Sequence, residues 1–177
     1  YSTLFRILRH LNLTPSDVFV DLGCGLGRSI FSASWLGAKR AVGVEIEGQL
    51  VEQAGQNRSH ARWRTRDIDF VHQSAEEYMH AETTVIFMFH PFGAGTMANV
   101  IRGLERTLAD RPRHLRIAYL NPVHGQVLDA SEQLVRIGHW PERQRERSGN
   151  GHYGVGFWAA KNGAERISSA PVKFAAH

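Results

Sequence analysis

The sequence has little of what would place it outside ordinary globular proteins. Cys24 is the one cysteine among 177 residues, which excludes an internal disulfide and a cysteine-rich zinc site. No apolar run approaches the roughly 18 residues that a membrane-spanning helix needs. No secretory signal is visible, so the sequence predicts a cytoplasmic protein without a membrane partner. The ten histidines form no H-x-x-x-H or H-E-x-x-H pair, and we expect no metal site.

Length and charge set broad limits on the protein. A chain of 177 residues is long enough for one sizeable hydrophobic core, so we expect a single domain. The net charge is +4, and most of the basic residues are arginines. This balance permits a nucleic acid, an acidic protein or an anionic metabolite as partner and does not choose among them.

Short apolar stretches rich in β-branched and aromatic residues recur along the chain and indicate β-strands. Most are too continuous to be exposed on one side, which is typical of a sheet covered on both faces. The last two are separated by a polar stretch, so we expect them to form a closing antiparallel pair. The expected strands are 18–22, 41–45, 68–72, 85–89, 116–120, 134–140 and 154–160.

Between the strands, apolar residues recur with the period of a helix. In the clearest case they lie at offsets 0, 3, 4, 7 and 11 from Met97. Gly37 is expected to close the helix that begins after residue 27. Alternating strands and helices with short connections predict an α/β fold with a mostly parallel sheet. The helical stripes are Leu4, Ile7, Leu8 and Leu11; Ile30, Phe31 and Trp35; Leu50, Val51 and Ala54; and Met97, Val100, Ile101, Leu104 and Leu108.

The stretch V-F-V-D-L-G-C-G-L-G-R at residues 18–28 carries the first functional signal. Glycine is required where a backbone turns sharply and approaches a ligand without an intervening Cβ. Such a loop after a strand can hold a dinucleotide, a phosphate or S-adenosylmethionine. The dinucleotide pattern G-x-G-x-x-G needs a third glycine at position 28, which is Arg28, and the Gly-Lys pair of a phosphate loop is absent.

Two acidic residues accompany the glycines: Asp21 lies two residues before the first of them, and Glu45 ends the next expected strand, in V-G-V-E-I. Glu45 lies 20 residues beyond Gly25, at a strand end where a carboxylate can accept hydrogen bonds from both hydroxyls of a ribose. The glycine loop and Glu45 together indicate a nucleoside ligand, without a device for binding a pyrophosphate.

D-L-G-C-G-L-G together with V-G-V-E-I resembles the motifs of class I S-adenosylmethionine-dependent methyltransferases. The resemblance implies a Rossmann-like, doubly wound, seven-stranded sheet with an antiparallel C-terminal strand and helices on both faces. It implies a methyltransferase domain over residues 1–161, with an N-terminal helix at 1–14 over the cofactor site and a tail at 162–177. F-V-D-L-G, V-G-V-E-I and H-P-F also resemble the histone-lysine methyltransferases of the telomeric-silencing-disruptor type.

The same resemblance assigns cofactor-binding residues. The glycine loop would approach the methionine portion of S-adenosylmethionine, the acid after the second strand would hold the ribose, and the loop after the third strand would lie beside the adenine. The implied residues are Asp21, Gly23, Cys24, Gly25, Gly27, Glu45, Ile46, Ser74, Ala75, Phe89 and His90.

Catalytic candidates follow the fourth and fifth expected strands. F-M-F-H-P-F-G resembles the N-P-F motif of methyltransferases acting on amino groups, with His90 in the place of the asparagine. Its imidazole is suited to act as a general base near neutral pH; alternatively, only its backbone carbonyl contacts the cofactor. Tyr119 and Asn121 are placed to face the acceptor, and His152 and Tyr153 are weaker candidates.

The sequence leaves the methyl acceptor open. Protein or peptide side chains and small metabolites fit about equally, and nucleic acid fits less well because the arginines are not interleaved with stacking aromatic residues. The core fold uses nearly all of the chain, so either a large acceptor docks on an open face or a second subunit of a homodimer covers the site. Two alternatives are a non-catalytic S-adenosylmethionine-binding or partner module and an NAD-dependent oxidoreductase, which Arg28 disfavours.

Overall fold

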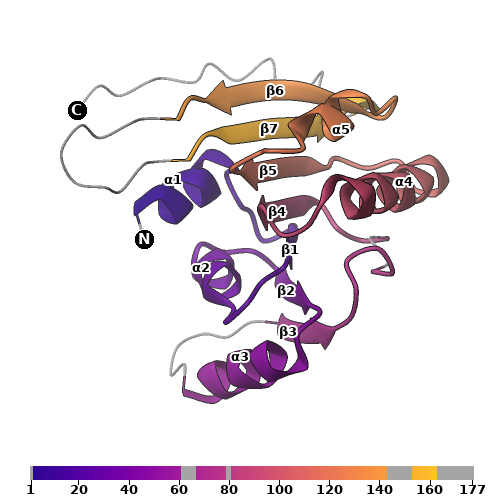
Figure 1. Cartoon of the computed structure of the whole chain (residues 1–177). Coiled ribbons are helices and arrows are strands. Elements are labelled where there is room, and N and C mark those ends of the chain that lie inside the picture. Colours follow the sequence, from indigo (N-terminus) through magenta and orange to yellow (C-terminus); the bar gives the residue numbers. More distant parts are fainter. Residues whose placement is uncertain (1, 61–66, 79–80, 143–152, 163–177) are drawn as a thin grey trace.

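A single mixed sheet of seven strands organises the computed structural model, which describes residues 2–60, 67–78, 81–142 and 153–162. The order across the sheet is β3-β2-β1-β4-β5-β7-β6 (Figure 1). From β3 to β5 the strands are parallel, and β7 runs antiparallel to both of its neighbours. The strands are β1 (Val18–Leu22), β2 (Arg40–Glu45), β3 (Asp67–His72), β4 (Val85–Phe89), β5 (Arg116–Leu120), β6 (Leu134–Trp140) and β7 (Val155–Ala160).

This sheet confirms the expected Rossmann-like α/β fold and its closing antiparallel pair. Each expected strand is present, and its ends lie within one residue of the expected positions. The agreement has a physical reason, since β2 and β7 are buried along nearly their whole length and so read as continuous apolar runs.

Helices cover both faces of the sheet, with α1 and α2 on one face and α4 and α5 on the other (Figure 1). The core under α4 includes Met97, Leu104, Ile117 and Trp158, and the core under α1 includes Ile7, Leu8, Phe19 and Phe87. Within the described ranges, no helix is long and apolar enough to cross a bilayer. The helices are α1 (Ser2–His10), α2 (Arg28–Trp35), α3 (Gly48–His60), α4 (Ala94–Asp110) and α5 (Gly125–Asp129).

The N-terminal helix is shorter than the expected range of residues 1–14. After α1 the backbone of Asn12 adopts a left-handed conformation with φ of +49°, which cannot continue a right-handed helix. The N–H of Thr14 then donates to the carboxylate of Asp17 at 2.8 Å, and this local bond starts the turn into β1.

The direction of chain crossover changes at β1. β2 pairs with one side of β1 and β4 with the other, so that Leu22 at the end of β1 is in register with Val44 and Met88. Ligands of open α/β sheets bind beyond the carboxyl ends of the strands at such a switch point. The glycine loop, Glu45 and His90 therefore follow three neighbouring strands along one edge of the sheet.

Candidate functional site

The loop between β1 and α2 is built on three glycines with left-handed backbones. The φ angles of Gly23, Gly25 and Gly27 are +83°, +51° and +81°. A residue with a Cβ adopts such angles only at a cost, because the Cβ approaches the following carbonyl oxygen. The spacing of glycines at every second position is therefore what lets β1 turn directly into α2.

The three glycines also differ in what surrounds them. A Cβ on Gly23 would lie 2.7 Å from the Cβ of Pro91, and a Cβ on Gly27 would lie 2.6 Å from the ring of Phe70. Both positions are thus closely packed, Gly23 against the loop after β4 and Gly27 against β3. A Cβ on Gly25 would have no neighbour within 4 Å. Gly25 therefore faces open space and leaves its backbone accessible to a ligand.

The carboxylate of Glu45 fixes the shape of this loop. Its Oε2 accepts the N–H of Gly25 at 2.9 Å, while Oε1 accepts the N–H groups of Ile46 at 2.8 Å and Glu47 at 3.1 Å. An ionised carboxylate has about four acceptor positions, of which three are used here. In this conformation the carboxylate of Glu45 can thus accept a hydrogen bond from one ribose hydroxyl. To accept from both hydroxyls, as expected from the sequence, it must give up one of its bonds to a backbone N–H.

Asp21 is a buried carboxyl with an unused acceptor. The residue is 4% exposed, and the hydroxyl of Ser29 donates to its Oδ2. Its Oδ1 has no hydrogen-bond partner among the described residues. Burial, with a smaller contribution from the charge of Glu45, raises the pKa of Asp21 to about 7. A cationic or hydrogen-bond-donating ligand group would complete this site, because an unpaired buried acceptor is costly.

A cavity of about 400 Å³ lies beside the glycine loop, between the start of α1 and the ends of β1, β4 and β5. Its wall combines the loop residue Gly23 and the carboxyl of Asp21 with Leu4 of α1. Phe89 and Tyr153 also line it, with ring centroids 5.4 Å apart. These two side chains are 48% and 49% exposed, so they form the mouth of the cavity.

The remaining expected cofactor residues gather at the ends of β2 and β3. Ile46 is 64% exposed and follows Glu45 directly. The N–H of Gln73 donates to the carbonyl oxygen of Glu45 at 3.0 Å, which places the half-buried Ser74 and Ala75 beside the end of β2. The structure therefore places these residues at the adjacent ends of β2 and β3.

Cys24 is a packing residue of the loop. It lies in the wall of the cavity and its thiol contacts the neighbouring strand, since a Cβ on Gly43 would lie 2.5 Å from its sulfur. Burial, followed by the charges of Asp21 and Glu45, raises the pKa of the Cys24 thiol to about 12. The thiol thus stays protonated and is not a nucleophile at neutral pH.

His90 and Asn121 directly follow neighbouring strands, β4 and β5, and share the same unusual backbone conformation. Their φ angles are +38° and +55°, both in the left-handed region. The N–H of His90 donates to the carbonyl oxygen of Leu120 at 3.2 Å. Its imidazole lies 5.8 Å from that of His124. The structure thus directs the ring of His90 toward the start of α5, and His90 is not among the described residues that line the cavity.

Tyr119 does not reach the cavity. Its side chain is fully buried in the core under α4, on the opposite face of the sheet, and burial raises the pKa of its hydroxyl. Asn121 follows at the edge of the sheet and is half-buried. His152 lies outside the described residues, whereas Tyr153 is at the mouth of the cavity.

Sequence reasoning missed several residues of the cavity wall, which are Thr3, Leu4, Leu26, Arg28, Ser29, Phe87 and Leu120. Ser29 follows Asp21 by eight residues and reaches it from the first turn of α2, a contact that helix geometry alone suggests only once the loop is known. Thr3 and Leu4 form the wall contributed by α1, and no local pattern identifies which end of that helix meets the sheet edge.

The raised pKa of the buried Asp21 carboxyl leads us to predict that the stability of the protein depends on pH. The native protein keeps the Asp21 proton up to about pH 7, whereas the unfolded chain releases it near pH 4. The native state then binds more protons in this window, so the free energy of unfolding falls as pH rises through it. Asp21→Asn is expected to flatten this fall in urea unfolding between about pH 4 and about pH 8. Asp110→Asn, at an exposed position on α4, is the control, and an unchanged slope in Asp21→Asn would contradict the assignment.

Comparison with known proteins identifies relatives of this chain. The model of the family described as "Histone methylation protein DOT1" matches residues 1–107. A histone-lysine N-methyltransferase of Caenorhabditis elegans, described as H3 lysine-79 specific, is 29% identical over 99 residues, which is 48% of this chain and 10% of that protein. An uncharacterized protein of Methanocaldococcus jannaschii is 42% identical over 55 residues, covering 31% of this chain and 24% of that protein. The chain thus spans about a quarter or less of the length of these relatives.

Solved structures share the fold over most of the chain. An RNA methyltransferase from Salinibacter ruber, in complex with S-adenosyl-L-homocysteine, has a TM-score of 0.63 at 20% identity, over 99% of this chain and 97% of that one. Magnesium protoporphyrin IX methyltransferase from Synechocystis, with bound S-adenosylmethionine, has a TM-score of 0.66 at 12% identity, over 90% and 77%. The shared architecture is the class I fold of methyltransferases that use S-adenosylmethionine. The family match confirms the resemblance read from the short motifs, and the chain belongs to the DOT1 family of histone methylation proteins.

Proposed function

We propose that this domain transfers a methyl group from S-adenosylmethionine to the ε-amine of a lysine in a protein. The observation that carries the proposal is the cavity with an aromatic mouth that meets the glycine loop at the switch point of the sheet. Membership of the DOT1 family supports a protein acceptor, and two relatives are described as H3 lysine-79 specific.

The residues at the sheet edge fit S-adenosylmethionine. The methionine end of S-adenosylmethionine is polar and carries an ammonium group. The unpaired Oδ1 of Asp21 suits that group as a hydrogen-bond acceptor, and the open space beside Gly25 leaves room for it. The remaining acceptor position of Glu45 suits a ribose hydroxyl, and the exposed side chain of Ile46 suits the flat face of an adenine. When bound, S-adenosylmethionine supplies a methyl group activated by its sulfonium.

The cavity offers the acceptor an apolar passage to that cofactor. Leu4 and Leu120 line it, and the rings of Phe89 and Tyr153 flank its mouth. Aromatic faces attract an ammonium group, while an apolar wall suits the methylene stem of a lysine. Burial lowers the pKa of an amine, so entry into the cavity favours the neutral form that can attack. Alignment of the amine by these walls then lowers the barrier to in-line transfer.

The proton of the lysine leaves toward solvent at the exposed mouth. In this proposal His90 has a backbone role only, since its N–H donates to the carbonyl oxygen of Leu120 and its ring lies against that of His124. This proposal gives the catalytic domain no obligatory side-chain base, which methyl transfer to an already neutral amine does not need.

Transfer of a labelled methyl group tests the acceptor. The protein is incubated with methyl-labelled S-adenosylmethionine and, in separate reactions, with core histones, nucleosomes, total RNA and a mixture of small amines. We expect label in protein, recovered as methyl-lysine after acid hydrolysis. Label in RNA or in small amines would contradict a lysine acceptor, and cofactor binding without transfer to any of them would favour a non-catalytic binding module.

Glu45→Gln tests the cofactor site. Loss of the negative charge weakens the bonds to the backbone of Gly25 and to a ribose hydroxyl, and hydrogen bonds to charged groups contribute about 1.5–3 kcal/mol. The Kd for S-adenosylmethionine, measured by calorimetry, is expected to rise about 10-fold or more. Glu47→Gln, at the exposed position two residues later, is the matched control and is expected to bind like the wild type. Equal affinities in the two variants would count against the assignment.

His90→Asn tests whether His90 acts through its imidazole, as a general base, or only through its backbone. Asparagine tolerates the left-handed backbone at this position and keeps the N–H bond to Leu120, so we expect kcat and its pH profile to stay near those of the wild type. Removal of a general base typically costs about 100-fold or more in rate. A loss of that size, with disappearance of a pH limb, would assign catalysis to the imidazole. His124→Asn, which removes the neighbouring ring and leaves His90 in place, is the control.

A further inference from the structure

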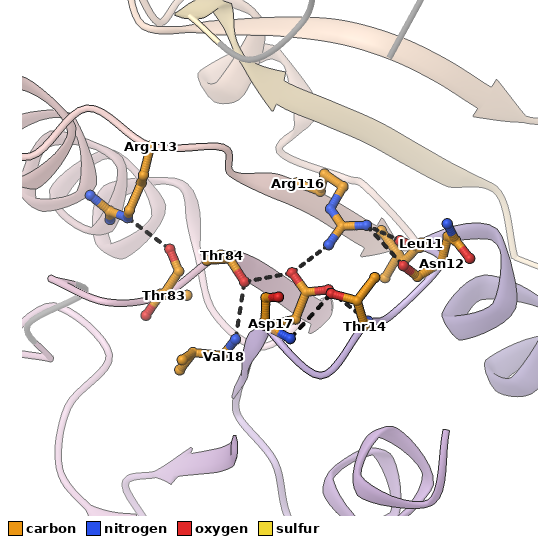
Figure 2. Close-up of polar contacts among 10 residues, drawn as sticks. Leu11, Asn12, Thr14, Asp17, Val18, Thr83, Thr84, Arg113 and Arg116 are labelled. Carbon is orange, nitrogen blue, oxygen red and sulfur yellow. Dashed lines mark hydrogen bonds and ion pairs between the residues drawn. The ribbon is translucent and has the colours of Figure 1, made fainter. Parts of the chain in front are cut away.

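An arginine at the start of β5 holds the C-terminal end of α1 (Figure 2). The Nη1 of Arg116 donates to the carbonyl oxygens of Leu11 and Asn12, the second at 3.3 Å. These carbonyls follow the last turn of the helix, where the backbone lacks helical partners and a cation also interacts favourably with the helix dipole. Arg116 thus acts as a side-chain cap supplied by a strand more than a hundred residues later in the sequence.

The second arm of Arg116 anchors this cap to the sheet. Its Nη2 lies 2.6 Å from Oδ1 of Asp17, which also accepts the hydroxyl of Thr84 at 2.8 Å. The other carboxylate oxygen accepts the N–H and the hydroxyl of Thr14. Burial alone would raise the pKa of Asp17, but the bonds from Arg116 and Thr84 keep it below its ordinary value, so this anchor is ionised at neutral pH. Asp17, Thr84 and Arg116 precede or begin β1, β4 and β5, and the network therefore lies at the amino edge of the sheet.

The opposite end of α1 belongs to the cavity. Thr3 and Leu4, in the first turn, line it at the carboxyl edge of the sheet. Between the two ends, Ile7 and Leu8 are fully buried against the sheet. A helix of nine residues is about 13 Å long, so a small tilt at the capped end becomes a displacement of the wall at the other end.

We propose that Arg116, acting through α1, is a positioning residue for the cavity that the methionine end of the cofactor shares with the acceptor. By holding the carbonyls of Leu11 and Asn12 against Asp17, it fixes the tilt of the helix and so the distance of Leu4 from the glycine loop. The inference rests on the proposed cofactor site. It adds that the affinity for the cofactor, which binds at the carboxyl edge of the sheet, depends on the ion pair between Arg116 and Asp17 at the amino edge.

The guanidinium is required for this geometry. Arginine presents several N–H donors in a rigid fork, which here reaches a carboxylate with one nitrogen and two carbonyls with another. A lysine at position 116 would keep the charge beside Asp17 but not the shared grip on the helix. Arg116→Lys is thus expected to keep most of the stability and to lose the positioning.

Arg113 provides a matched control in the same segment (Figure 2). Its Nη1 donates to the carbonyl oxygen of Thr107 at 2.9 Å, near the end of α4, and its Nε donates to the carbonyl oxygen of Thr83 at 2.8 Å. Arg113 lies in the connection between α4 and β5 and therefore caps the end of a helix with its side chain, as Arg116 does. Its helix α4 contributes no residue to the wall of the cavity.

The experiment compares Arg116→Met with Arg113→Met. S-adenosyl-L-homocysteine binding is measured by calorimetry, thermal stability by unfolding, and the opening of α1 by amide hydrogen exchange. Both variants are expected to lose stability, but only Arg116→Met is expected to raise the Kd, about 5-fold or more, and to speed exchange in α1. Equal changes in Kd in the two variants, or an unchanged Kd in Arg116→Met, would overturn the proposal.

Two further variants keep the test decisive. If Arg116→Met leaves Asp17 as an unpaired buried charge and fails to fold, the double variant Asp17→Asn, Arg116→Met removes both charges and takes its place. Leu4→Ala alters the wall directly, so its effect on Kd should be less than additive with that of Arg116→Met, and additive effects would contradict action through α1. If the wild-type protein binds no S-adenosyl-L-homocysteine, the cofactor site itself is refuted. Amide hydrogen exchange in α1 would then still show whether Arg116 caps the helix.

Discussion

A buried carboxylate at the end of β2 holds the backbone of the glycine loop in place. Glu45 accepts N–H groups from Gly25 on one side and from Ile46 and Glu47 on the other, and so joins the turn after β1 to the turn after β2. A loop made of left-handed glycines has few side chains of its own to fix its shape. The same carboxylate is the group best placed to meet a ribose. Under the proposed function, loop conformation and cofactor binding are coupled through this one side chain, because a ligand that takes a second bond from Glu45 must release a backbone amide.

Two buried aspartates near β1, Asp17 and Asp21, differ in their hydrogen-bond partners and therefore in their roles. Asp17, before the strand, receives four hydrogen bonds, stays ionised and ties the amino ends of three strands to α1. Asp21, within the strand, receives one hydrogen bond from Ser29 and has a raised pKa. A satisfied carboxylate rigidifies the fold, whereas an incompletely satisfied one at a cavity wall is suited to a ligand. α1 connects the two edges of the sheet, since its C-terminal end is capped at the amino edge and its first turn lines the cavity at the carboxyl edge.

The parallel sheet was predictable because its strands are buried on both faces and therefore stand out as apolar runs, as β2 does. The glycine loop was predictable because its left-handed backbone allows few residue types, and Glu45 stood out as a carboxylate at the end of the next strand. The face on which a residue lies was harder to predict: Tyr119 and Leu120 are adjacent and equally apolar in context, yet one packs under α4 and the other lines the cavity. The pairing of Phe89 with Tyr153 and the cap that Arg116 places on α1 join distant parts of the sequence, and no local pattern encodes such contacts.

A crystal structure of the protein with S-adenosyl-L-homocysteine tests the central claim most directly. The account predicts the amino acid end of the ligand beside Asp21 and the backbone of residues 23–25, the ribose at Glu45, and the sulfur directed into the cavity behind Phe89 and Tyr153. Cofactor bound away from the glycine loop, or a sulfur directed away from that cavity, would contradict it.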